Sequence, residues 1–122
     1  MKKFLDSLTY ALQGVHRFFS KERNGQIQAV FGLAAILLGF ILSISSFQWL
    51  LVLLCIGLVI SLEMINSAIE KLCDLVTADF HPAIKIIKDV AAGAVLVASI
   101  FSLIVGLLIF IPAIVQFVNK LL

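Results

Sequence analysis

The residues from Asn24 to Leu62 carry no charged side chain, and this stretch restricts the possible folds more than any other feature of the chain. A single helix of that length would be about 58 Å long, nearly twice the roughly 30 Å thickness of a bilayer's hydrocarbon core. The stretch must therefore turn back on itself. We expect the turn at the polar cluster Ser43–Trp49, where the tryptophan is typical of a membrane interface.

A second uncharged stretch over residues 90–119 predicts one more spanning helix, whereas residues 1–21 predict a helix of another kind. Apolar residues recur on one helical face of that first segment, and the opposite face is basic. A short basic amphipathic helix lies in the membrane interface rather than across the bilayer. We therefore expect an all-α integral membrane protein, a single domain over residues 1–122, with a surface helix over 1–21 and transmembrane helices over 25–43, 47–72 and 88–113.

The composition agrees with a membrane protein. Apolar residues make up 62% of the 122 positions and charged residues 13%, against roughly 45–50% and 25% in ordinary globular domains. A soluble domain this small could not bury so much apolar surface. This argues against a soluble enzyme, a disordered chain and a nucleic-acid-binding protein.

Lysine and arginine predict the orientation in the membrane. Five of them lie before the first span and three lie between the second and third spans, at Lys71, Lys85 and Lys88. The connection between the first two spans has none. The positive-inside rule then places the N-terminus and the 71–89 loop in the cytoplasm.

Four polar residues share one face of the second spanning helix: Glu63, Asn66, Glu70 and Asp74 follow at intervals of three, four and four. A charged group inside a span costs about 2.5–3.5 kcal/mol, so these acids need a partner or a function. One interpretation is structural, with the acids facing a bundle interior. The other is a cation site, since oxygen ligands suit Mg²⁺ together with substrate phosphates. The stripe predicts a Mg²⁺–nucleotide site with one carboxylate left for acid–base chemistry.

Two further residues are open to two interpretations each. Tyr10 is an aromatic residue on the polar face of the first helix, where it would act as an interfacial anchor or contact a ligand. His81 is expected on a loop, as a surface residue or as a ligand. Neither GxxxxGK[ST] nor GxGxxG occurs, so a nucleotide would be bound without a soluble kinase fold.

Three segments resemble the small prokaryotic integral-membrane lipid kinases, the diacylglycerol kinase and undecaprenol kinase family. The run Glu63–Asp74 (EMINSAIEKLCD) is similar to the family's signature, Lys88–Val95 (KDVAAGAV) to a second block and Glu22–Asn24 (ERN) to a third. The likeness covers roughly residues 3–112. Cys73 departs from the pattern, which has a branched apolar residue there, but it lies off the polar stripe.

The resemblance implies a homotrimer that binds ATP and Mg²⁺, has active sites between subunits at the membrane surface, and transfers the γ-phosphate directly to a lipid hydroxyl. It implies that Glu63 is the general base and that Glu22 and Glu70 hold the metal. The ATP contacts that it implies are Tyr10, Glu22, Glu70, Asp79, His81, Lys88 and Asp89. The supporting residues near the base are Asn66, Ser67 and Asp74.

The segments Glu22–Asn24 and Gly106–Pro112 look more like the undecaprenol kinases of Gram-positive bacteria than like diacylglycerol kinases. The residues outward from Glu63, Leu50 to Leu62, are nearly all apolar and offer few donors to ester carbonyls. Undecaprenol is therefore the expected acceptor. The alternatives are a diacylglycerol kinase and, more distantly, a non-enzymatic membrane oligomer.

Overall fold

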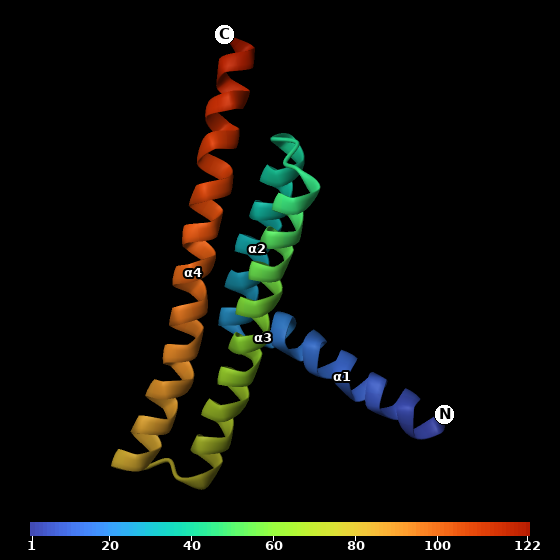
Figure 1. Ribbon diagram of the computed structural model, residues 1–122. Helices are drawn as coiled ribbons and strands as arrows, with labels where there is room; N and C mark the ends of the chain where they lie inside the picture. Colours follow the sequence, from blue (N-terminus) through green and yellow to red (C-terminus); the bar gives the residue numbers. More distant parts are fainter.

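The computed structural model describes residues 1–122 as four helices (Figure 1). They are α1 (Lys2–Lys21), α2 (Arg23–Ile41), α3 (Ser46–Val76) and α4 (Pro82–Leu121). The helices α2, α3 and α4 are long and apolar enough to cross a membrane. The predicted all-α arrangement of one amphipathic helix and three candidate spans is therefore confirmed.

The connection between α2 and α3 is the turn expected at the polar cluster. Ser43 adopts a positive φ of 51°, a backbone conformation rarely used by residues other than glycine, which lets the chain reverse within a few residues. Ser45 then caps α3. Its hydroxyl accepts from the Gln48 backbone amide, and the Gln48 side chain accepts from the Ser45 amide in a reciprocal capping box.

The connection between α3 and α4 is much shorter than the expected 71–89 loop. The helix α3 continues to Val76, and α4 begins at Pro82, so only residues 77–81 are non-helical. His81 caps α4 and Pro82 occupies its first turn, where a missing amide proton is tolerated. Lys85, Lys88 and Asp89 consequently lie on a helix. At the other end, α4 runs through Pro112 to Leu121, past the predicted end at residue 113.

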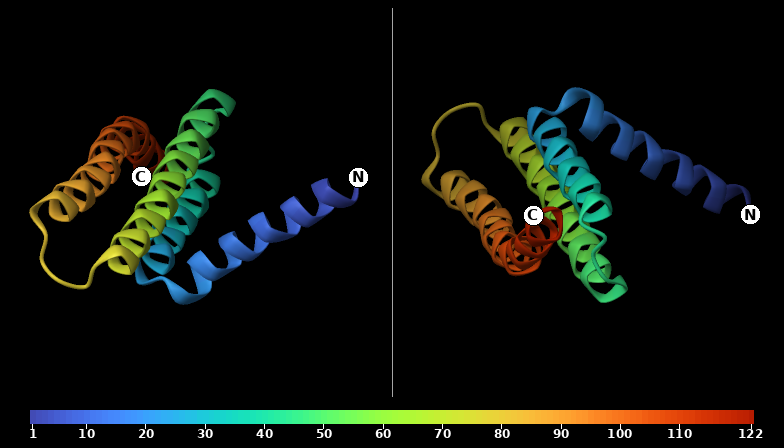
Figure 2. Two further views of the ribbon diagram at one scale, coloured as in Figure 1. Left: turned by 90° about the horizontal axis from the view of Figure 1, so that it is seen from below. Right: turned by 90° about the horizontal axis from the view of Figure 1, so that it is seen from above.

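The helix α3 is the central element, and it makes the main contacts with both α2 and α4 (Figure 2). Against α4 the buried seam includes Val95, Ala98 and Ile109. Against α2 the close approach depends on glycine: a Cβ added at Gly32 would lie 3.3 Å from the Ile56 side chain. Small residues thus allow the backbones of neighbouring spans to come close.

Most side chains of the three long helices face outward. Only 13 of the 122 residues are buried, and the one cluster of buried apolar residues, Ile44, Val52 and Ile109, lies near the α2–α3 turn. In a bilayer the outward apolar surface needs no burial, because lipid is as apolar as the side chains. The apolar core therefore lies at one end of the bundle and leaves the other end for polar residues.

The helix α1 projects away from the other three helices (Figures 1 and 2). Phe18, near its C-terminal end, is its only buried residue. Most of its other apolar residues, including Phe4 and Leu12, are exposed, which suits a helix whose apolar face is immersed in the membrane interface.

Candidate active site

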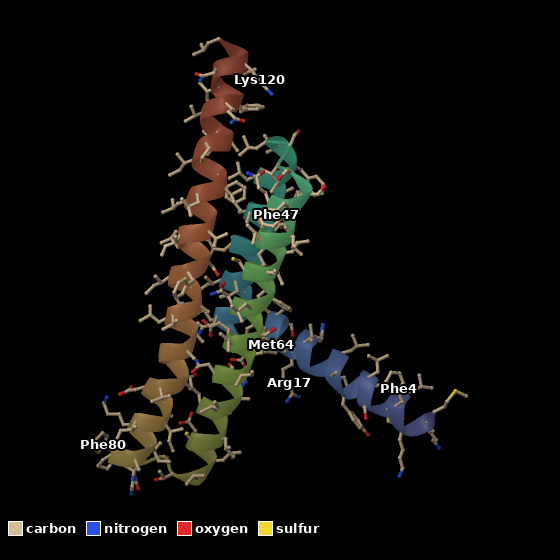
Figure 3. The ribbon with its side chains drawn as sticks, viewed as in Figure 1. Phe4, Arg17, Phe47, Met64, Phe80 and Lys120 are labelled. Carbon is tan, nitrogen blue, oxygen red and sulfur yellow. The ribbon has the colours of Figure 1, made fainter.

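The polar stripe on α3 changes from buried to exposed along the helix. Glu63 is 8% exposed and Asn66 5%, Glu70 is half-buried, and Asp74 is exposed. Figure 3 shows Met64, the neighbour of Glu63, beside the C-terminal end of α1, whereas Phe80 lies at the far end of the α3–α4 hairpin. The buried part of the stripe is therefore the part that α1 and α2 adjoin.

The corner between α1 and α2 is built around Glu22. This residue caps the end of α1 and the start of α2, with an extended backbone (φ −95°, ψ 127°). The corner is tight: a Cβ at Gly25 would lie 2.3 Å from the carbonyl oxygen of Phe18. Only a glycine fits at that distance. The corner brings two polar side chains, Glu22 and Asn24, against α3.

Glu22 is held by two side chains of α3. Ser67 Oγ donates a hydrogen bond to Glu22 Oε2 at 3.3 Å, and Lys71 Nζ forms an ion pair with Glu22 Oε1. The hydrogen bond from Lys71 lowers the pKa of the Glu22 carboxyl below its ordinary value, with partial desolvation opposing the shift and the charge of Lys71 and the Ser67 hydroxyl adding to it. The Glu22 carboxyl thus stays ionised to a lower pH than an ordinary glutamate.

Asn24 contacts the buried acid. Its Nδ2 donates to Glu63 Oε2 at 3.4 Å, which orients the carboxylate. Glu63 Oε1 makes no hydrogen bond within the chain, and it is not fully buried. One oxygen of Glu63 is therefore oriented and the other is free to accept a proton or a hydrogen bond.

Asn66 contacts the next acid along the stripe. Its Nδ2 donates to Glu70 Oε1 at 3.2 Å, while its buried Oδ1 has no hydrogen-bond partner. A buried acceptor without a partner is costly and rare in native structures, and a bound ion or water is one explanation for it. Asn66 thus contributes an unsatisfied oxygen next to the Glu70 carboxylate.

The oxygen atoms of this cluster fit Mg²⁺. No three acidic, histidine or cysteine side chains converge closely enough to hold a metal by themselves. Mg²⁺ is usually held by one or two carboxylates together with substrate phosphates and water. Glu22 and Glu70 could supply those carboxylates, since Glu22 bonds Ser67 and Glu70 lies one turn further along α3.

The remaining residues expected to bind ATP lie apart from this cluster. Tyr10 is about 18 Å along α1 from Glu22, at 1.5 Å per residue, and its side chain is exposed. Asp79 and His81 lie in the α3–α4 connection, where His81 Nδ1 accepts from the Ala83 amide at 3.2 Å. Within one chain, the structure does not bring these three residues to Glu22 or Glu63.

The two lysine–aspartate pairs lie near that connection. Lys88 pairs with Asp74 at 2.5 Å and so joins α4 to the exposed end of the stripe. Lys85 pairs with Asp89 at 2.5 Å, one turn apart on α4. Asp74 and Lys88 are therefore held together across two helices, whereas Asp89 pairs with a lysine of its own helix.

Asn24 and Lys71 are site residues that sequence reasoning did not single out. Both belong to the segments that carry the resemblance, Glu22–Asn24 and Glu63–Asp74. Lys71 follows Ser67 by four positions, so the two share a face of α3, and that spacing is the signal in the sequence. Nothing in the sequence indicated that Ser67 and Lys71 would contact Glu22, which lies 45 residues before Ser67 and 49 residues before Lys71.

An apolar cleft of about 620 Å³ opens between α2, α3 and α4. Most of its lining is hydrophobic. The lining includes Val59, one turn before Glu63, and Gln28, one turn after Asn24. The cleft therefore leads from the level of the buried acid into the apolar layer.

These features define a class of protein: a small multi-pass membrane protein with a carboxylate and amide cluster where its apolar layer ends. A family model described as prokaryotic diacylglycerol kinase matches residues 9–110. The chain therefore belongs to the prokaryotic diacylglycerol kinase family, and it is a lipid kinase.

The similar proteins include both an undecaprenol kinase and diacylglycerol kinases. The undecaprenol kinase of Bacillus subtilis is 41% identical over 112 residues, which cover 92% of this chain and 91% of the relative. A diacylglycerol kinase of Synechocystis is 38% identical over 109 residues, 88% of this chain and 62% of the relative. A diacylglycerol kinase of Helicobacter pylori is 32% identical over 100 residues, 82% of this chain and 78% of the relative.

Proposed function

We propose that this lipid kinase phosphorylates undecaprenol to undecaprenyl phosphate with ATP and Mg²⁺. The observation that carries the proposal is Glu63, a buried carboxylate with one oriented and one free oxygen, at the level where an apolar cleft ends. A long polyprenol has a single hydroxyl and an apolar chain. The similarity to the undecaprenol kinase of Bacillus subtilis supports the same choice.

In the proposed reaction, the lipid hydroxyl attacks the γ-phosphorus of ATP, ADP leaves, and Glu63 accepts the hydroxyl proton. Asn24 keeps the Glu63 carboxylate oriented by donating to its Oε2. Glu22 and Glu70 would hold Mg²⁺, which neutralises charge on the phosphates. Phosphoryl transfer needs mainly positioning and charge neutralisation, so a small site suffices.

The proposed ATP contacts require more than one chain. Tyr10, Asp79, His81, Lys88 and Asp89 do not all converge on Glu22 and Glu70 within a single chain. We therefore propose that the active sites form between subunits, in the homotrimer that the family resemblance implies. The basic residues of α1 and the first turn of α2, together with Lys71, Lys85 and Lys88 on either side of the α3–α4 connection, support an orientation with the N-terminus and the site in the cytoplasm.

The test is a substrate panel with purified protein in mixed micelles at matched lipid mole fractions, in which ³²P transfer from ATP is measured. We expect a higher kcat/KM for undecaprenol than for diacylglycerol, with measurable activity on the second lipid, because recognition of a lone hydroxyl discriminates weakly between headgroups. A clear preference for diacylglycerol would assign the chain to the second function. No transfer to either lipid would overturn the proposal.

A further inference from the structure

Lys71 has no role in the proposed reaction, yet it makes the ion pair that joins α3 to the α1–α2 corner. Its partner Glu22 lies 49 residues earlier in the chain, and the Glu22 side chain is 24% exposed. The other two ion pairs differ, because their carboxylates, Asp74 and Asp89, are each more than 60% exposed. The Lys71–Glu22 pair is thus the ion pair whose carboxylate is best shielded from solvent.

Both oxygens of Glu22 are engaged. Oε2 accepts from Ser67, and Oε1 is taken by the Lys71 ammonium. A divalent cation that binds Glu22 therefore meets a carboxylate that already has a positive partner. An ammonium and a metal ion that share one carboxylate oxygen repel each other, so occupation of Oε1 by one disfavours the other.

We propose that Lys71 is the resident counter-ion of Glu22 in the metal-free enzyme and competes with the metal for that carboxylate. When Mg²⁺ arrives with the nucleotide, Lys71 leaves Oε1, and its flexible four-carbon stem lets the ammonium move away from the ion. The pair keeps the α1–α2 corner closed against α3 while the site is empty. This inference rests on the proposed role of Glu22 as a metal ligand.

The experiment measures binding of Mn²⁺ with a non-hydrolysable ATP analogue, by electron paramagnetic resonance of free Mn²⁺, in nanodiscs that contain no lipid acceptor. Lys71→Met removes the ammonium and keeps the apolar stem. We expect Mn²⁺ to bind this variant about two- to fivefold more tightly. This range corresponds to the small free energy that an exposed ion pair usually contributes. Lys71→Arg keeps the positive partner and should bind Mn²⁺ as the unmodified chain does.

Two controls separate competition at Glu22 from a general effect of charge. Lys21→Met removes the same charge one residue from Glu22, at an exposed lysine that makes no ion pair, and should leave Mn²⁺ affinity unchanged. In a Glu22→Gln background, Lys71→Met should have no further effect, because the shared carboxylate is gone. The apparent melting temperature in EDTA should fall in Lys71→Met, and the difference should shrink when Mg²⁺ and the analogue are added.

Unchanged or weaker Mn²⁺ binding by Lys71→Met would overturn the inference, as would an effect that persists in the Glu22→Gln background. Glu22→Gln alone distinguishes this failure from failure of the proposed site. If Glu22→Gln weakens Mn²⁺ binding and Lys71→Met does not strengthen it, only the role of Lys71 is wrong. If Glu22→Gln leaves binding unchanged, Glu22 is not a metal ligand and both assignments fall.

Discussion

Gly25→Ala tests whether the α1–α2 corner positions the catalytic cluster. The added Cβ would lie 2.3 Å from the Phe18 carbonyl oxygen, and it would also lie 3.0 Å from the Phe18 ring. Ordinary van der Waals contact begins near 3.4 Å, so the two segments must separate by about 1 Å. Overpacking of this kind costs about 1–3 kcal/mol, too little to unfold three apolar spans. The strain is absorbed at the corner that carries Glu22 and Asn24.

A displacement of about 1 Å in a reacting group can lower a rate by roughly 10²-fold. We therefore expect Gly25→Ala to lose about two orders of magnitude in kcat/KM and to need more Mg²⁺ for half-maximal rate. The assay is ³²P transfer in mixed micelles over a Mg²⁺ titration, with helicity followed by circular dichroism.

Gly14→Ala is the matched control for this change. A Cβ at Gly14 meets nothing within 4 Å, and alanine favours the helix over glycine, so turnover should be unchanged. If Gly25→Ala retained normal turnover and a normal Mg²⁺ titration, the corner would not be what positions Glu22.

Three further changes test the other assignments. Glu63→Gln keeps the shape of the side chain but removes the proton acceptor, so ³²P transfer should fall by about 10²-fold or more while membrane insertion persists; near-normal turnover would exclude Glu63 as the base. Glu22→Gln and Glu70→Gln should each raise the Mg²⁺ concentration for half-maximal rate, and an unchanged Mg²⁺ titration in both would refute the metal site. Ala98→Leu, at a 5% exposed position facing α3, should lower the melting temperature in detergent, whereas Leu96→Ala, at a 61% exposed position, should change it little; equal effects would contradict the packing of α4.

The sequence alone determined the helical architecture with its three candidate spans and placed the polar stripe on one face of α3. Uncharged runs too long for one bilayer crossing and the polar cluster at residues 43–49 are local patterns, and they were enough to place α2, α3 and the turn between them. The intervals between Glu63, Asn66, Glu70 and Asp74 put these residues on one face of α3, because helical periodicity depends only on positions in one segment. The resemblance then connected the stripe with phosphoryl transfer.

The local sequence did not show where the charged helical turns begin and end. The predicted span begins at residue 88 and leaves Lys85 outside it, but the cap at His81 and the Lys88–Asp74 pair extend α4 back to Pro82. A cap and a cross-helix ion pair stabilise a polar turn of helix that composition alone would not favour. The start of α4 is therefore set by its cap and by a contact with α3.

Only the tertiary structure decided which residues meet in the site. Asn24 reaches Glu63 across 39 positions, and Lys71 reaches Glu22 across 49. Both contacts depend on how the α1–α2 corner docks against α3, and that corner is tight because the Phe18 backbone lies close to Gly25. Helical periodicity specifies the face of a helix on which a residue lies. Which residues lie opposite that face depends on how the helices pack together. That packing involves several segments at once, so no single segment of the sequence specifies it.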